Sequence, residues 1–448
     1  MEQQQHMFSN RLICSLLIPV VLEQLLNSIM GTADTMMVSN VGSAAISAVS
    51  LVDSINVLVI QAFSALAAGG AIVCAQYIGQ KNKEKANESA RQVLFIITAI
   101  SVAVSLICLV FQKPLLRLIF GSVEPAVMSA SETYFFYTAL SFPFIAAYDS
   151  AASIFRAQDN TKGPMIISMI SNVMNIAGNA VMIWVFHMGV AGAALSTLIS
   201  RIFCAVVVII QLRKEREGQE IVVRDYFKIR PDWSMIRRIL GLGIPSGVEN
   251  SMFQLGKILL LSLISTFGTA SIAANAVSNS LAYFEILPGM ALGLATVTVI
   301  SRCVGAGDYP QAEYFAKRLL KFTYTCMWIT CIVMMLLLPF MLKIYNLSPE
   351  TSGYATQIMI LHSIMAMIFW PAAFALPNVF RAANDVRFTM VVGVTSMWLF
   401  RIACAFIFGK YMGFGVFGAW IAMVLDWVVR AIFYVIHYRC GKWKEKSL

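Results

Sequence analysis

The chain has 448 residues, of which 59% are hydrophobic and only 12% are charged, and its formal net charge is +10. A soluble domain has about 25% charged residues, so this composition excludes an ordinary soluble protein and predicts a chain embedded in lipid. Most basic residues lie between long apolar runs, which excludes a nucleic-acid-binding surface as their explanation. The nine cysteines are scattered without a C-x-x-C pair or a Cys/His cluster, so we expect reduced packing residues.

The N-terminal segment MEQQQHMFSN lacks the charged region and the small-residue cleavage site of a signal peptide. We therefore expect the first apolar run to be a true membrane span, which requires about 20 mostly apolar residues. Twelve spans are predicted at roughly 12–37, 51–75, 92–111, 133–155, 165–186, 190–212, 238–266, 275–301, 319–342, 354–379, 389–409 and 415–438. The long charged connection at 213–237 predicts a cytoplasmic linker between an N-terminal six-helix lobe (1–212) and a C-terminal six-helix lobe (238–448).

The distribution of basic residues predicts the orientation, because Lys and Arg favour the cytoplasmic side of a membrane. With the N-terminus inside, the cytoplasmic segments and their edges hold 25 of the 33 Lys and Arg residues, and the outer segments hold four. We therefore expect a multi-pass protein of the plasma (inner) membrane with both termini in the cytoplasm.

The sequence matches itself when it is shifted by 225 or 226 residues. The matched segments are Pro19-x-x-x-Glu23 with Pro245-x-x-x-Glu249, Gly189–Ala193 with Gly415–Ala419, and Phe155–Ala157 with Phe380–Ala382. Because each half has an even number of spans, both halves have the same orientation, and the repeat is parallel. Parallel repeats of this kind are typical of transporters whose substrate sites lie between the halves near the membrane midplane.

Charged side chains at membrane depth are costly and usually face a cavity. Asp34 in the first span is the sharpest candidate, since residues 25–52 hold no other charge. Desolvation of such a carboxylate is relieved by a proton or Na⁺, although a helix-end carboxylate in interfacial water is the alternative. Asn175 and Asn179 lie four apart on one helical face, where they can ligate a cation or join helices by hydrogen bonds.

Glu249 is the candidate cation ligand of the second half. It follows Pro245 by one turn, and this proline frees the carbonyl group of Gly241, so the segment is predicted to form a cation site or a hinge. Lys257 lies two turns further along the same helix, about 12 Å away by the helical rise. A water-bridged pair between Glu249 and Lys257 is therefore the alternative.

The remaining intramembrane candidates are substrate or cleft residues. These are Asp149, Lys257, Tyr283, Glu285, Arg401 and Asp426. Tyr283 and Glu285 are two apart and do not share a helical face, so we expect at most one to reach a cleft. Arg401, Asp426 and Arg430 are expected to form a charge network between the last two spans.

Arg156 and Arg381 end matching spans at the cytoplasmic face. The repeat predicts a cytoplasmic latch at these arginines, with simple interfacial anchoring as the alternative. The sequence contains no P-loop, no G-x-S-x-G, no zinc motif and no c-type haem motif. We therefore expect no enzyme activity and no cofactor, and an ion gradient as the driving force. No metal site is fixed beyond a Na⁺ site at Glu249 or Asp34.

A series of segments spread along the length of the chain is typical of one protein family. In chain order these segments are PVVLEQLLNSIMGTADTMMV, IGQKNKEKANESARQVL, FRAQDNTKGP, NIAGN, GVAGAALST, IPSGVENSMFQLGK and FRAANDVRFTM. Together they resemble the multidrug and toxic compound extrusion (MATE) family. The resemblance covers nearly the whole chain and implies an all-α membrane protein with two pseudo-symmetric six-helix lobes. It also implies secondary active antiport, by alternating access, of amphipathic or cationic organic compounds against H⁺ or Na⁺.

The resemblance also implies a cation site in the first lobe. Asp34 matches the family's span 1 aspartate, Asn175 and Thr197 match an asparagine and a threonine of that site, and Tyr134 matches in span 4. The chain departs from the common N-I-x-x-D pattern, because Asn179 replaces the second acid. In the second lobe, Glu249 matches a glutamate that Na⁺-coupled relatives use, whereas the span 10 region FWPAAFALPNVF lacks the aspartate that some relatives add.

The sequence leaves two alternative functions open. A flippase for lipid-linked saccharides would share the architecture but would favour a more basic cleft than one with seven intramembrane acids and four bases. A membrane-embedded enzyme or a receptor-like scaffold is the alternative from another class, although the loops are short. The expected partners are small amphipathic organic substrates and the lipid bilayer, without nucleic acid, and the protein is expected to work as a monomer.

Overall fold

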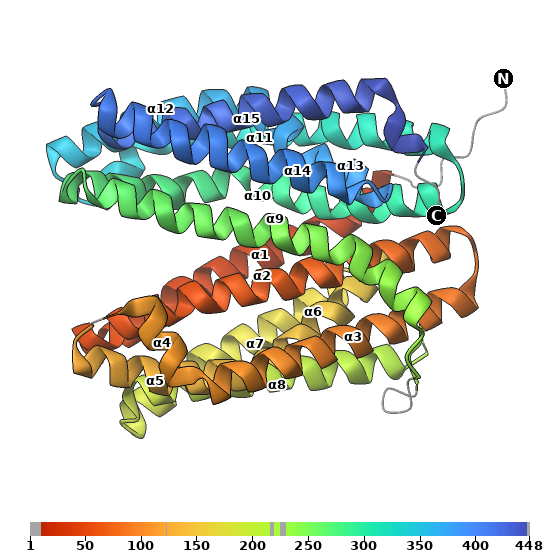
Figure 1. The fold of residues 1–448 in the computed structure, drawn as a ribbon, viewed down its shortest axis with the longest axis horizontal. Coiled ribbons are helices and arrows are strands. Elements are labelled where there is room, and N and C mark those ends of the chain that lie inside the picture. Colours follow the sequence, from red (N-terminus) through yellow and green to blue (C-terminus); the bar gives the residue numbers. More distant parts are fainter. Residues whose placement is uncertain (1–9, 122, 216–218, 225–229, 446–448) are drawn as a thin grey trace. The chain divides into compact units, whose positions relative to one another are not determined.

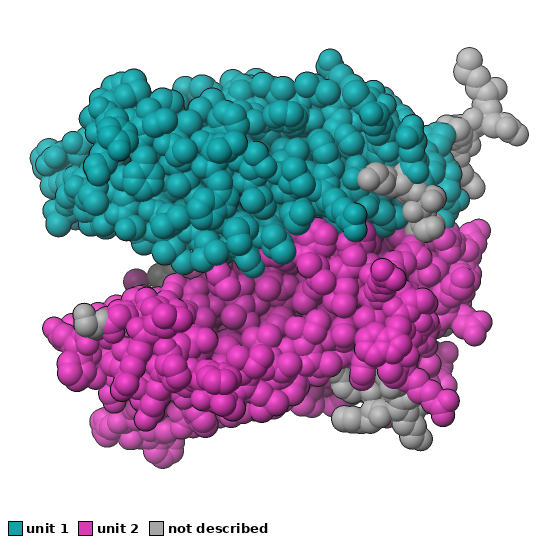
Figure 2. All heavy atoms as spheres, in the orientation of Figure 1, with its two compact units in different colours: residues 1–9, 248–448 teal, residues 10–247 magenta. Residues whose placement is uncertain are grey.

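The computed structural model describes residues 10–121, 123–215, 219–224 and 230–445, and every regular element of these residues is a helix. The chain forms two compact units, which Figure 2 shows in different colours. One unit contains residues 10–247, and the other contains residues 248–448. The boundary between the units falls inside α9 (Trp233–Ser265). The linker at 213–237 stays a prediction.

The helices of the N-terminal half precede α9 (Figure 1). They are α1 (Asn10–Ser39), α2 (Ser43–Gly79), α3 (Lys83–Val110), α4 (Gln112–Phe120), α5 (Pro125–Leu140), α6 (Phe142–Ala157), α7 (Lys162–Ala180), the π-helical turn η1 (Val181–Val185) and α8 (Gly189–Arg213). α5 and α6 meet at Ser141, just before Pro143, which has no backbone N–H to donate. Together they form the fourth predicted span.

The C-terminal half repeats this order from α9 onward. Its later elements are α10 (Thr269–Gly305), α11 (Tyr309–Ile344), α12 (Pro349–Trp370), η3 (Pro371–Ala375), α13 (Pro377–Ala382), α14 (Val386–Ser396), η4 (Met397–Ala403), η5 (Phe406–Tyr411), α15 (Gly415–Cys440) and η6 (Lys442–Lys444). α2 and α10 begin and end 226 residues apart. The predicted repeat is therefore present in the helices themselves.

Ten helices of the described residues are long and apolar enough to cross a membrane. The two predicted spans outside this set are the one formed by the shorter α5 and α6, and α9, which contains Glu249 and Lys257. The prediction of an all-α integral membrane protein with two six-helix lobes is confirmed.

The left-handed turns between helices also follow the repeat. The positions with positive φ in the first half are Gly42, Lys81, Gly121, Asp159, His187 and Gly189, and they fall on Gly268, Gly307, Asn346, Asn384, Gly413 and Gly415, which also have positive φ. A left-handed conformation costs a non-glycine residue roughly 1–2 kcal/mol. In every pair at least one member is Gly, Asn or Asp, which tolerate this conformation. The two halves therefore keep one backbone path through their turns.

One close backbone contact lies within the unit of residues 10–247, between α2 and the start of α9. A Cβ atom on Gly69 would lie 2.6 Å from the backbone nitrogen of Gly243, and one on Gly243 would lie 2.9 Å from the Cα atom of Leu66. Small residues at such contacts let membrane helices approach closely. Neither backbone can move aside as a flexible side chain would.

We expect Gly69→Ala to lower the free energy of unfolding by about 1–3 kcal/mol, because the added methyl group forces α2 away from α9. Thermal unfolding of the detergent-solubilised protein measures the change. Gly241→Ala is the matched control, since a Cβ atom on Gly241 meets nothing within 4 Å. The control should be neutral or stabilising by up to about 1 kcal/mol. Equal behaviour of the two variants would contradict a tight contact at Gly69.

Candidate ion and substrate sites

Four of the predicted cation-coupling residues form one hydrogen-bonded chain in the first lobe. The Asn179 side-chain amide of α7 donates to the Asp34 carboxylate of α1, and also to Asn175 Oδ1 at 3.4 Å. Asn175 Nδ2 in turn donates to Thr197 Oγ1 of α8 at 3.2 Å. Asn175 and Asn179 are 1% and 0% exposed. A carboxylate is thus linked to two buried amides and a hydroxyl group, all of which offer oxygen atoms.

Close packing of α7 on α8 places this chain. Gly178 faces Ser196 so tightly that a Cβ atom on the glycine would overlap the serine hydroxyl group. Ser196 Oγ donates to the Asn175 carbonyl oxygen at 2.9 Å. Because Asn175 and Asn179 lie one turn apart, the same helix face reaches both Thr197 and Asp34.

Two other candidates of the first lobe lie outside the chain. The Tyr134 hydroxyl group donates to Asp53 Oδ1 at 3.3 Å, and Asn56 Nδ2 donates to the same oxygen at 3.1 Å. Asp149 Oδ2 accepts from Ser64 Oγ at 2.5 Å. Asp53 was not among the predicted site residues. The sequence pattern that could have indicated Asp53 is its spacing from Asn56, since residues three apart share a helical face.

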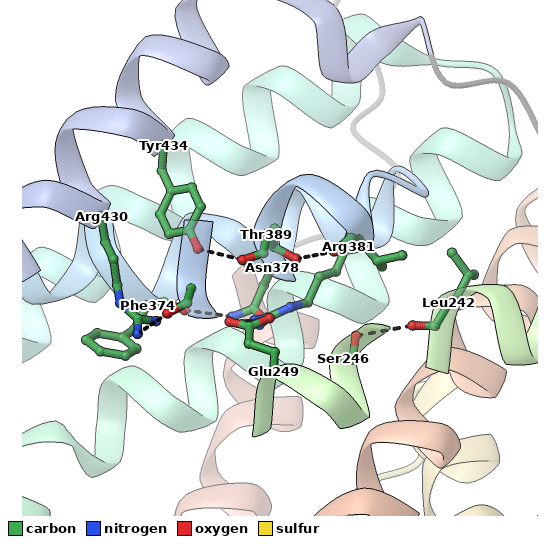
Figure 3. A network of polar contacts seen from close by, with 11 residues as sticks. Leu242, Ser246, Glu249, Phe374, Asn378, Arg381, Thr389, Arg430 and Tyr434 are labelled. Atoms are coloured by element: carbon green, nitrogen blue, oxygen red, sulfur yellow. Dashed lines mark hydrogen bonds and ion pairs between the residues drawn. The ribbon is translucent and has the colours of Figure 1, made fainter. Parts of the chain in front are cut away.

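The carboxylate of Glu249, the candidate cation ligand of the second lobe, is held by Arg381 (Figure 3). Arg381 Nη2 of α13 lies 2.9 and 2.8 Å from the two carboxylate oxygens, and its Nη1 donates to Asn378 Oδ1 at 3.0 Å. Gly393 leaves the space for this pair, since a Cβ atom there would lie 2.6 Å from Glu249 Oε1. The carboxylate therefore has a guanidinium where a bound cation would have to sit.

The first lobe contains the same ion pair at the matching positions. Arg156 Nη2 of α6 lies 3.2 Å from Glu23 Oε1 of α1, and the Tyr148 hydroxyl group donates to the same oxygen at 3.3 Å. Each predicted latch arginine thus binds the glutamate of the first helix in its own lobe. The alternative pair of Glu249 with Lys257 is replaced by the pair with Arg381.

The predicted charge network near the last two spans is present. Asp426 Oδ1 of α15 lies 2.8 Å from Arg430 Nε, and its Oδ2 lies 3.8 Å from Arg401 Nη1 of η4. Ser396 also donates to Asp426. The Asp426 carboxylate is therefore the counter-charge of both Arg430 and Arg401.

Glu285 lies in a buried polar cluster with His362 and Ser363, which were not among the predicted site residues. Its side chain is 0% exposed, lies 2.6 Å from His362 Nδ1 and accepts from Ser363 Oγ at 2.5 Å. The His362 ring lies edge-on against Trp420 and Trp427. A lone histidine in an apolar span gives no sequence signal of its partner. Tyr283 is half-buried and does not join this cluster.

We expect Glu285→Leu to lower the free energy of unfolding by roughly 1–3 kcal/mol, because it leaves the buried His362 Nδ1 without its partner, whereas Ser363 Oγ can still donate to the Met359 carbonyl oxygen. Thermal unfolding in detergent measures this loss. Tyr283→Phe, two residues away, is the matched control and should change stability little. A stable Glu285→Leu variant with altered transport would instead assign Glu285 to a functional site.

Within the described residues, no group of three His, Cys, Asp or Glu side chains is placed to hold a metal ion. A Na⁺ site at Asp34 would rest on carbonyl and hydroxyl oxygens beside a single carboxylate, a donor set that suits a hard cation.

Comparisons with known proteins agree with this architecture. The MatE family model matches residues 19–181 and again residues 245–407, in the register of the repeat. The "Uncharacterized transporter YisQ" of Bacillus subtilis is 27% identical over 97% of this chain and 95% of its own length. The "Probable multidrug resistance protein NorM" of Thermotoga maritima is 24% identical over 97% and 93%. A solved outward-facing MATE transporter structure of the MOP superfamily shares the fold, with a TM-score of 0.89 at 20% identity over 97% of this chain and 96% of that one.

Proposed function

The chain belongs to the MATE family of multidrug efflux transporters, and we propose that it is a secondary active antiporter that exports amphipathic or cationic organic compounds in exchange for H⁺ or Na⁺. Family members are transporters and not enzymes. The relatives named as probable multidrug resistance proteins support small organic substrates for this chain.

The observation that carries the proposal is the hydrogen-bonded chain from Asp34 to Thr197. A carboxylate at membrane depth binds a cation because the cation relieves its desolvation. Binding and release of that cation at one face or the other can bias an alternating-access equilibrium only if the two conformations bind it with different affinity. Asp34 is favoured over Glu249 as the coupling site, because Glu249 already has Arg381 as its counter-charge.

We further propose that the protein lies in the plasma membrane with both termini in the cytoplasm and functions as a monomer. The basic residues between the spans support this orientation.

Inverted membrane vesicles that contain the protein test the antiport function. They should accumulate ethidium when H⁺ or Na⁺, each loaded separately, flows out of the vesicle. Vesicles without the protein provide the background. Ethidium accumulation that is indifferent to both gradients would remove the antiport proposal.

A further inference from the structure

Three cationic side chains of the second lobe surround one aromatic ring. Lys257 Nζ lies 5.1 Å from the centroid of the Phe253 ring, Arg401 Cζ lies 5.2 Å from it, and Arg430 Cζ lies 5.9 Å from it. Because all three distances are measured to the same ring centroid, the three cationic groups lie close to one another. We call Lys257, Arg401 and Arg430 the basic cluster.

The carboxylates of the described second lobe do not neutralise the basic cluster. Asp426 pairs closely with Arg430 and only at 3.8 Å with Arg401. Glu249 is held by Arg381, which lies outside the cluster. Among the described residues, Lys257 makes no ion pair and is exposed. Three positive charges thus share one carboxylate.

Arg401 has unused hydrogen-bonding capacity. The residue is 8% exposed, and its Nε is buried with no hydrogen-bond partner within the described part of the chain. Buried polar groups are normally paired, and each orphan calls for an explanation such as an absent ligand. A guanidinium fork fits the oxygens of a carboxylate, sulfonate or phosphate group.

The repeat places one residue of the basic cluster, Arg401, at a position of the first lobe's cation chain. With an offset of 226, Asp34 falls on Leu260, Asn175 on Arg401, Asn179 on Ala405 and Thr197 on Met423. Ile176 and Ala177 fall on Ile402 and Ala403, which supports this register. The second lobe has therefore lost every oxygen ligand of the chain and has gained a guanidinium in its place.

We propose that the basic cluster binds the anionic group of an amphipathic compound, with the Phe253 ring beside it as an apolar contact. The inference rests on the export function proposed above and adds to its substrates amphipathic compounds that bear a carboxylate, sulfonate or phosphate group. Lys257 contributes the accessible charge, and Arg401 contributes the buried fork. A soluble organic anion and the headgroup of an anionic lipid share this chemistry.

Equilibrium binding tests this inference independently of ion coupling. The purified full-length protein in dodecyl maltoside is titrated with the fluorescent carboxylate 11-(dansylamino)undecanoic acid and with its uncharged methyl ester. The wild-type protein should bind the acid about tenfold more tightly than the ester, the effect of one charge-assisted contact. Lys257→Gln should abolish this preference, and Lys257→Arg should keep most of it. Lys410→Gln, which removes an exposed charge of the same lobe outside the cluster, should leave the preference unchanged.

Nanodiscs with and without phosphatidylglycerol distinguish the two sources of the anion. Competition by phosphatidylglycerol assigns the site to a lipid headgroup, and unchanged binding assigns it to a soluble anion. Equal affinity of the wild-type protein for acid and ester would overturn the inference, as would equal losses in Lys257→Gln and Lys410→Gln. A failure of ion-driven ethidium transport would leave these binding results untouched and would count only against the antiport function.

Discussion

Asp34→Asn is expected to abolish ion-driven efflux while the protein remains folded in the membrane. An amide is nearly isosteric with a carboxylate and can still pair with Asn179, but it cannot take up a proton or attract Na⁺. A carboxylate at membrane depth costs about 2.5–3.5 kcal/mol, which is the free energy that a bound cation offsets. Loss of a coupling term of this size should lower the initial rate of gradient-driven ethidium accumulation on the order of 100-fold.

Asp149→Asn is the matched control for Asp34→Asn. Asp149 is another intramembrane carboxylate of the same lobe, but it pairs with Ser64 and does not touch the Asp34 chain. We expect Asp149→Asn to retain most of the ion dependence. If Asp149→Asn abolished coupling and Asp34→Asn preserved it, the coupling site would have to be moved to Asp149. Protein content of the vesicles, measured by immunoblot, separates lost transport from lost protein.

The residues of the first lobe's cation chain were predictable from local patterns and from the family resemblance, which grouped Asn175 and Thr197 with Asp34. Asp34 is a single charge within a long apolar run, and Asn175 and Asn179 share a helical face by spacing alone. The match of the sequence with itself at an offset of 225 or 226 predicted the two lobes, and the lengths of the apolar runs predicted the spans. The partner of each side chain was harder to predict, because a contact between helices depends on tertiary packing.

Glu249 pairs with Arg381 and not with Lys257, the partner that spacing along the helix suggested. Lys257 lies on the same helix as Glu249 and was the only nearby cation by spacing, whereas Arg381 is 132 residues away. The internal repeat nevertheless indicated the pair of Glu249 with Arg381. Glu23 and Glu249 match each other, as do Arg156 and Arg381, and two charges of opposite sign that repeat together are candidates for a pair. His362 has no such counterpart signal, so its contact with Glu285 needed the structure.

The two lobes share one arrangement of helices but differ in most of their charged groups. The Glu–Arg pair occurs in both lobes, whereas the cation chain occurs in the first and the basic cluster in the second. A group that repeats in both lobes is explained most simply by the shared frame. A group that occurs in one lobe is the better candidate for ion coupling or substrate choice.

This division predicts a structural role for the Glu249–Arg381 pair. Glu249→Gln should lower the free energy of unfolding by about 3–5 kcal/mol, because the Arg381 guanidinium stays half-buried without its counter-charge. Glu23→Gln should cause a similar loss in the first lobe, where it leaves Arg156 in the same position. Thermal unfolding in detergent measures both variants. Glu350→Gln, at an exposed position of α12, should change stability by less than about 1 kcal/mol.

The double variant Glu249→Gln/Arg381→Gln makes the test specific to the pair. Two neutral amides can hydrogen-bond to each other, so part of the lost stability should return, and the double-mutant cycle should show a coupling energy of about 1–3 kcal/mol. The ion dependence of ethidium transport by surviving Glu249→Gln protein should match that of the wild type. A fully stable Glu249→Gln variant that loses its response to Na⁺ would instead make Glu249 an ion ligand, with Arg381 as the group that Na⁺ displaces.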